Sequence, residues 1–364
     1  MAIYLSVLSL IVTAMVIYNF PRAPKWLKNG ALVFSCLLLV VISGLRYNVG
    51  TDYMNYMWMY DGYSGEDPIT IYEKPGLHLI GRIAAFIYNH HTTWFIMMAL
   101  LTVSLFFFGI KKYSVNVTMS VFLFIFLGVW HGSFNTVKQH AAAAIFFASF
   151  PFLYKKDFLS WMFSCVLATF FHEASLIMLP MYFIFTFEHK YMPYFIVALG
   201  LAAFVGKDII IFAVDILKAN EKSMGDTEII NQGVGTIRTI VSCAPVFFYC
   251  LFCQPNDFIA HEMIGENVKD FEHKTDKKFN CLLNIAIFSA VMSVALSSSV
   301  YFIRLLIFFD VFNVLFVPYL VKPFNKEKKN VFTVLILALY CVFWWVDITK
   351  ASTVNYQWVF MIKE

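Results

Sequence analysis

Ionisable side chains stand close together in the stretch RYNVGTDYMNY, residues 46–56, which directly follows the apolar run ALVFSCLLLVVISGL. Arg46 and Asp52 supply a cation and a carboxylate, and Tyr53 and Tyr56 supply aromatic rings. Arginine binds phosphate oxygens through paired hydrogen bonds, and a carboxylate can take a proton from a hydroxyl group. The stretch therefore has the residue types needed to bind an anion and to activate a nucleophile.

Further candidates stand at or near the ends of other apolar runs. Lys138 lies in NTVKQHAAAAI, where small alanines let other helices approach closely. Arg304 lies in VYFIRLLIFFDVFNVLF with apolar neighbours on both sides, so its charge needs a partner. His172 follows an apolar run, and Glu73 is a loop carboxylate. Interfacial cations also extend toward lipid headgroups without a binding role, and this alternative stays open for Arg46.

Known metal and nucleotide motifs are absent from the sequence. HEASL is not an HExxH motif, because the residue four after His172 is Leu176. No DxD pair, Walker loop, GxGxxG or GxSxG occurs. Nearly all of the seven cysteines lie inside apolar runs, where they act as small apolar side chains. We therefore expect neither a metal nor a cofactor. Instead we expect cationic side chains to stabilise a phosphate-bearing substrate and its leaving group directly.

The composition is that of a protein embedded in a membrane. Hydrophobic residues make up 60% of the 364 residues and charged residues 14%, against about 25% charged in soluble domains. The length suffices for roughly a dozen membrane helices of about 20 residues each. The net charge is +4, and the basic residues stand between apolar runs, which excludes a nucleic-acid interface. Residues 1–364 are predicted to form a single integral membrane domain.

Thirteen apolar runs are candidate membrane helices. They cover residues 3–20, 30–45, 76–89, 93–110, 115–130, 141–154, 158–171, 174–187, 192–206, 237–253, 279–297, 304–321 and 331–347. The first run has no positive charge before it and no small-residue cleavage site after it. We therefore expect it to be a retained span and not a signal peptide.

Lysine and arginine loops set the orientation of the spans. The basic residues 22–28 and 111–112 should both be cytoplasmic, yet three runs separate them, so one run cannot cross. We expect it to be 76–89, because it is short and contains His78 and Arg82, and a charge at mid-bilayer costs roughly 2.5–3.5 kcal/mol. The predicted fold is an all-α polytopic membrane protein with about twelve transmembrane helices plus this re-entrant or interfacial segment.

This topology separates the loops by side. Loops 46–92 and 207–236 are predicted to face outward, and loop 254–278 is predicted to face the cytoplasm. The candidate residues at positions 46–56, 138–140, 172, 238 and 304 then share the outer face. We expect a common outer cavity in which aromatic rings stack on sugars, although aromatic belts at membrane interfaces produce the same pattern.

Several segments resemble motifs of the EpsG family of exopolysaccharide and O-antigen polymerases, often called Wzy-type. RYNVGTDYMNY resembles the RxxxGTDxxxY signature, and EKPGLHLI resembles an E-x-G element through Glu73. NTVKQHAAAAI resembles an R-Q-x-x-A helix start through Gln139, with Lys138 where arginine is usual. FHEAS resembles an FHxS element through His172, and YFIR resembles a late arginine-bearing span through Arg304. The segments occur in the family's order over most of the chain.

The resemblance implies a fold similar to the GT-C class of lipid-dependent glycosyltransferases. It implies a metal-independent polymerase at the outer face of the bacterial inner membrane. The donor would be a growing glycan on undecaprenyl pyrophosphate, and the acceptor a single repeat unit on the same carrier. Membrane lipid and a chain-length regulator protein are the other partners expected by family analogy.

Site roles follow as hypotheses. The predicted pyrophosphate-binding residues are Arg46, Lys138 and Arg304, and the predicted substrate-contacting residues are Tyr53, Tyr56, Gln139 and Arg238. The proton acceptor is predicted to be one of Asp52, Glu73 and His172, and the sequence does not choose among them. Lysine at position 138 keeps the charge of the usual arginine but cannot form its bidentate hydrogen bonds.

Two other functions share part of this pattern. A flippase or other transporter of lipid-linked oligosaccharides also has about a dozen spans with interior cations, but many such carriers contain internal repeats. The two halves of this sequence show no convincing similarity, and its charges favour one face. An O-antigen ligase shares the donor chemistry, but its large outer loop is only partly matched by 207–236.

Overall fold

The computed structural model of the chain describes residues 1–65, 74–187, 194–202, 204–205, 236–254, 259–260, 274–295, 297, 300–350 and 355–361. The chain divides into two compact units. Unit 1 contains Met1–Phe150, Met162–Leu176 and Thr333–Glu364, and unit 2 contains Pro151–Trp161 and Ile177–Phe332. Apolar side chains are buried in both.

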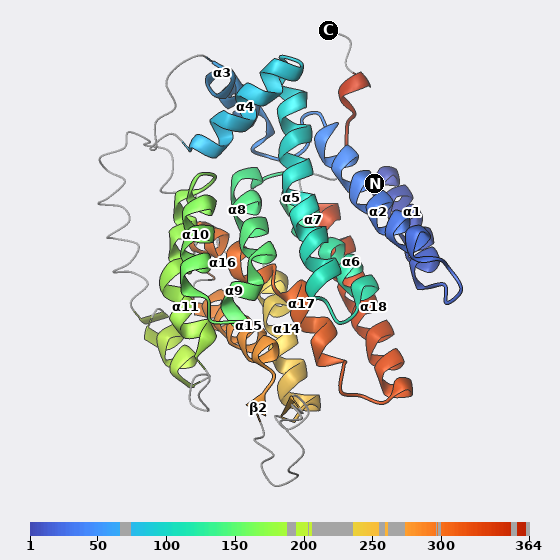
Figure 1. Cartoon of the computed structure of the whole chain (residues 1–364), viewed down its shortest axis with the longest axis vertical. Coiled ribbons are helices and arrows are strands. Elements are labelled where there is room, and N and C mark those ends of the chain that lie inside the picture. The colour runs from blue at the N-terminus through green and yellow to red at the C-terminus, as the bar shows by residue number, and fades with distance from the viewer. Residues whose placement is uncertain are drawn as a thin grey trace. The chain divides into compact units, whose positions relative to one another are not determined.

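Helices dominate the described residues (Figure 1). In chain order they are α1 (Ala2–Asn19), α2 (Lys25–Gly44), α3 (Tyr53–Ser64), α4 (Pro75–Ile87), α5 (His91–Tyr113), α6 (Val117–Phe126), α7 (Val129–Gly132), α8 (Val137–Ala148), α9 (Phe150–Tyr154), α10 (Phe158–Thr169), the 3-10 turn η2 (Glu173–Ile177), α11 (Met178–Thr186), α14 (Thr236–Phe252), α15 (Lys277–Ala295), α16 (Val300–Asp310), α17 (Asn313–Leu320), α18 (Lys326–Lys350) and η4 (Val359–Met361). Two short strands, β1 (Ile259–Ala260) and β2 (Lys274–Thr275), pair antiparallel.

Five helices among the described residues are long and apolar enough to cross a membrane, namely α1, α2, α5, α15 and α18. Shorter apolar stretches of 10–17 residues occur at Pro75–Ile87, Val117–Phe126, Phe158–Thr169, Glu173–Thr186 and Ile237–Phe252. These findings agree with the predicted all-α membrane protein. About twelve spans and a GT-C-like arrangement stay predictions.

Helices α2 and α5 of unit 1 pack against each other in opposite directions. The end of α2 lies against the start of α5, because a Cβ on Gly44 would lie 2.6 Å from Cγ1 of Ile96, and only glycine allows this approach. The basic residues at the start of α2 and at the end of α5 therefore lie at the same end of the helix pair. The positive charges require this arrangement if the run 76–89 does not cross.

Helices α3 and α4 pack on each other and on α5 (Figure 1). With 13 residues, α4 is about 20 Å long, shorter than the ~30 Å hydrocarbon core. Pro75 occupies its first turn, where the missing N–H leaves no bond unmade. Leu77 and Ala84 are fully buried, whereas Phe86 is 92% exposed. The helix is therefore short and buried on one side, and its re-entrant or interfacial placement stays a prediction.

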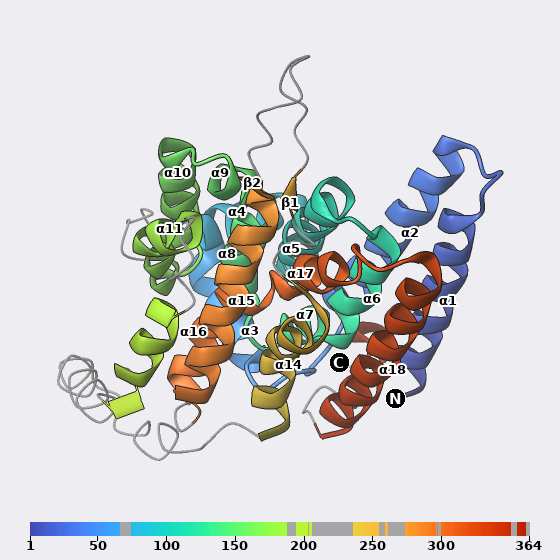
Figure 2. The same cartoon turned by 90° about the horizontal axis from the view of Figure 1, so that it is seen from below.

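Unit 2 is built on α15, which packs against α11, α14, α16 and α17 (Figure 2). The buried Asn284 of α15 donates from its amide nitrogen to the carbonyls of Phe185 and Phe187, at 3.3 and 3.2 Å, near the end of α11. A buried amide needs such partners, so these bonds hold the two helices at one register. Residues 207–235 of the predicted loop 207–236 and most of the loop 254–278 lie outside the described residues.

Candidate functional site

Arg46 lies just after α2, enclosed by protein. The residue is 2% exposed, and its Nη groups donate to the carbonyls of Ser43 and, at 3.3 Å, of Phe134. The ring centroids of Phe95 and Phe134 lie 4.6 and 5.0 Å from its Cζ. Burial lowers the pKa of Arg46 to about 10, so the group stays charged at neutral pH. Carbonyl dipoles and aromatic faces therefore surround this charge.

Gly50 shapes the turn that follows. Its φ of +103° belongs to the region that L side chains rarely adopt. The backbone N–H of Thr51 donates to Oδ1 of Asn135 at 2.8 Å, and a Cβ on Gly50 would overlap that same oxygen. The GTD sequence therefore needs glycine both for its backbone angle and for the approach of Asn135. The hydrogen bond from Thr51 to Asn135 therefore holds the segment that carries Asp52 against the turn before α8.

The segment 355–361 pairs with the chain on both sides of the buried arginine. The backbone N–H of Tyr47 donates to Gln357 at 2.9 Å, and that of Val359 donates to Leu45 at 3.1 Å. These two bonds form an isolated antiparallel bridge. The pairing joins parts of unit 1 that are far apart in sequence, and it encloses the turn around the arginine.

Two lysines from distant parts of the chain meet in unit 1. Nζ of Lys74, the residue before α4, lies 3.3 Å from Oε2 of Glu173, and Nζ of Lys138 in α8 lies 5.6 Å from the ring centroid of Tyr56. The pKa of Lys138 is lowered to about 8 by burial and then by the charge of Lys74, against the opposing effects of Glu173 and Asp52. Bringing like charges together is unfavourable, and a bound anion would relieve it. We call Lys74, Lys138 and Glu173 the lysine cluster.

Local backbone structure places Lys74 opposite Glu173. Lys74 adopts a left-handed conformation, with φ +59°, as the chain turns into α4. The N–H of Gly76 donates to the carbonyl of Phe170 at 3.0 Å, and a Cβ on Gly76 would come within 3.0 Å of that oxygen and of the Phe171 ring. The glycine thus lets α4 begin directly on the turn that carries Glu173.

The predicted proton acceptors have different surroundings. Asp52 is half-buried before α3 and acts electrostatically on Lys138. His172 is half-buried, directly beside Glu173, and its Nδ1 accepts the N–H of Ala174 at 3.2 Å. Glu73 lies outside the described residues. Asp52 and His172 therefore both adjoin the lysine cluster.

The tyrosines predicted to contact sugars lie inside unit 1. Tyr53 is 0% exposed and stacks on Phe95 at 4.8 Å between ring centroids, and Tyr56 is 5% exposed. Both rings are covered by protein in this structure, and their substrate-contacting role stays a prediction. Gln139 is half-buried, and its Oε1 has no hydrogen-bond partner among the described residues. That oxygen is an acceptor next in sequence to Lys138.

The remaining predicted cations belong to unit 2. Arg238 is exposed on α14, and Arg304 is half-buried on α16. At the end of α16, Asp310 accepts hydrogen bonds from the hydroxyls of Ser242, at 3.4 Å, and Ser289, and it interacts electrostatically with Arg238. The pyrophosphate-binding role of Arg304 and the substrate-binding role of Arg238 stay predictions.

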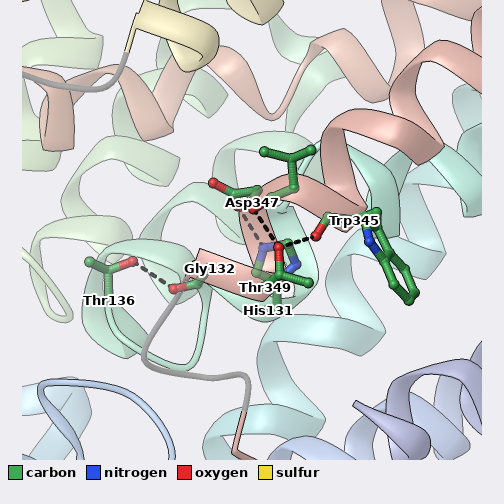
Figure 3. Close-up of polar contacts among 7 residues, drawn as sticks. His131, Gly132, Thr136, Trp345, Asp347 and Thr349 are labelled. Carbon is green, nitrogen blue, oxygen red and sulfur yellow. Dashed lines mark hydrogen bonds and ion pairs between the residues drawn. The ribbon is translucent and has the colours of Figure 1, made fainter.

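A histidine–aspartate pair links α7 to α18 (Figure 3). Nε2 of His131 lies 3.0 Å from Oδ2 of Asp347, and the two side chains are 3% and 18% exposed. Gly128, with φ +80°, makes room for the ring, because a Cβ there would lie 3.3 Å from its Cε1. Nδ1 of His131 has no partner among the described residues. The pair therefore gives Nε2 of the buried His131 ring a hydrogen-bond partner.

Replacing Asp347 by alanine is expected to lower the free energy of unfolding by about 1–3 kcal/mol, because the buried ring of His131 loses its partner. Thermal unfolding in detergent measures the change. The matched control is Thr349→Val, whose exposed hydroxyl donates, among the described residues, to carbonyls of its own helix and should change stability by less than about 0.5 kcal/mol. Equal effects of the two substitutions would contradict a stabilising role for the pair.

The sequence-based site prediction missed Lys74 and Glu173, although each directly adjoins a predicted residue. The available signal was two opposite charges at the ends of apolar runs on the predicted outer face. Their pairing depends on how α4 meets the turn after α10. In the described part of the chain no group of three or more His, Cys, Asp or Glu side chains could hold a metal ion. Metal independence stays a prediction.

Comparison with known protein families gives a match over most of the chain. The model of the EpsG family matches residues 30–359, a range that contains the Arg46 turn, the lysine cluster and the predicted residues of unit 2. No curated protein and no solved structure matches the chain.

Proposed function

This chain belongs to the EpsG family, as its motifs predicted, and on that premise we propose that it polymerises lipid-linked oligosaccharide repeat units. Family membership indicates a role of the polysaccharide-polymerase type in a membrane. The proposed donor is a growing glycan on undecaprenyl pyrophosphate, and the proposed acceptor is a repeat unit on the same carrier. The proposed place is the outer face of the bacterial inner membrane.

The lysine cluster is the single observation that carries this proposal. Lys74 and Lys138 would bind the pyrophosphate oxygens and stabilise the negative charge that grows on them as the sugar leaves. An acceptor hydroxyl attacks the anomeric carbon, the bond from that carbon to the pyrophosphate oxygen breaks, and the hydroxyl proton passes to a base. The products are a longer glycan and undecaprenyl pyrophosphate.

Arg46 contributes differently in this proposal. Its guanidinium is buried and hydrogen-bonded to carbonyls, so it would hold in place the turn that leads to Asp52. Its charge would also add positive potential to the site without contacting the substrate. Arg304 is proposed as a further pyrophosphate ligand from its position in the family motif, and Gln139 as an acceptor for a sugar hydroxyl.

The test is reconstitution. Purified protein in liposomes is given undecaprenyl-pyrophosphate-linked repeat units, and products are separated on a gel. We expect a ladder of longer glycans, with one undecaprenyl pyrophosphate released per new bond. Movement of the lipid between leaflets with no new bond would favour the flippase. Transfer only to a different lipid acceptor would favour the ligase.

A further inference from the structure

Sequence left three candidates for the proton acceptor, and the structure disfavours one of them. Nδ1 of His172 accepts the N–H of Ala174 at 3.2 Å, so the neutral ring carries its proton on Nε2. Neither nitrogen of that tautomer is then free to take a proton from a sugar hydroxyl. His172 is better suited to donate a hydrogen bond than to act as a base.

Glu173, the next residue, has the features that His172 lacks. Its carboxylate is 71% exposed, and Nζ of Lys74 lies 3.3 Å from Oε2. The N–H of Ser175 donates to the carbonyl of His172 at 3.1 Å, and the N–H of Gly76 donates to Phe170 at 3.0 Å, so the backbone around Glu173 is held. An accessible carboxylate on a fixed turn, beside the cations that would bind the leaving group, is suitably placed for general-base catalysis.

Resting on the proposed polymerase function, we propose that Glu173 is the general base and that Lys74 controls it. Before the donor binds, the ammonium of Lys74 stabilises the ionised carboxylate and makes it a poor proton acceptor. A bound pyrophosphate competes for Lys74. Glu173 is thereby released, and its Oε2 takes the proton of the acceptor hydroxyl as that oxygen attacks the anomeric carbon.

The arrangement couples the two halves of the reaction. The cation that restrains the base also binds the leaving group, so Glu173 becomes a stronger base only when a pyrophosphate is present. The titratable groups that face Glu173 are Lys74 from the start of α4, Lys138 from α8, Tyr63 from α3 and the adjacent His172. Of these, Lys74 is the group in direct ionic contact.

The experiment compares wild type with Glu173→Gln in the reconstituted polymerisation assay. Glutamine keeps the shape but cannot accept the proton, so kcat should fall about 100-fold with little change in KM for the donor. Binding of undecaprenyl pyrophosphate, measured directly, should stay within about twofold. Asp61→Asn, which removes an exposed carboxylate on α3, is the matched control and should retain activity.

A second variant tests the control by Lys74. Lys74→Met should move the acidic limb of the pH profile of kcat/KM to higher pH, because Glu173 loses the cation that stabilises its ionised form.

Full kcat in Glu173→Gln, or joint loss of kcat and of undecaprenyl pyrophosphate binding, would overturn the base assignment. If wild type itself forms no polymer, the proposed function fails and the assignment fails with it.

Discussion

Lys138→Met should lower polymer formation by about 10²–10³-fold, the usual effect of removing one group that stabilises transition-state charge. Methionine keeps the length of the side chain over Tyr56, so the local packing is retained. Lys74, the other lysine of the cluster, is already paired with Glu173 and would compensate only in part for the lost charge. Rates of ladder formation by the reconstituted protein measure the loss. Lys112→Met, at the end of α5, is the matched control and should leave the rate unchanged.

The same lysine predicts how the rate depends on pH. The pKa of Lys138 is about 8, so its charge is present below that pH and is lost as the pH rises through it. The groups that face it are Lys74, Glu173 and Asp52. Since kcat/KM reports the free enzyme, it should fall above about pH 8 in wild type. Lys138→Arg keeps its charge at all these pH values, and it should remain active without that fall. An identical alkaline limb in both proteins would contradict the assignment of this limb to Lys138.

Gly50→Val should abolish polymer formation. Valine at a φ of +103° is strained, and its Cβ would overlap the Asn135 oxygen that accepts the N–H of Thr51. Backbone strain of this kind costs about 1–3 kcal/mol, and the turn that carries Asp52 would have to move. Activity in liposomes and thermal unfolding in detergent measure the two effects.

Gly62→Ala is the matched control for that substitution. A Cβ on Gly62 meets nothing within 4 Å in α3, and alanine favours a helix over glycine by about 1 kcal/mol. This variant should be active and at least as stable as wild type. If Gly50→Val also retained full activity, the shape of the turn after Arg46 would not matter for function.

Much of the class of this protein could be predicted from residue types and their order. Sixty per cent hydrophobic content and runs of membrane length predict helices in a bilayer, because backbone groups in lipid must bond within their own segment. The basic loops 22–28 and 111–112 predicted that one of the three runs between them does not cross the membrane, with the short run 76–89 as the candidate, and this stays a prediction. The RxxxGTDxxxY pattern predicted the EpsG family, since motifs record residues that a shared site needs.

Contacts between distant residues decided the composition of the site. Lys74 and Glu173 are separated by helices in the chain, and their 3.3 Å pairing exists only because Gly76 lets α4 start on the turn after Phe170. The bridge between Tyr47 and Gln357 leaves no pattern in either segment, because backbone hydrogen bonds do not depend on side-chain identity.

Burial likewise came only from the tertiary structure. Sequence placed Arg46, Tyr53 and Tyr56 on an outer face, where each could meet substrate. The fold buries all three inside unit 1, with Arg46 and Tyr53 against Phe95 and Tyr56 beside Trp94. Hydrophobic periodicity locates a helix, but aromatic and long cationic side chains suit both a core and a binding surface. Which of the two they occupy is determined by the neighbours that the fold brings to them.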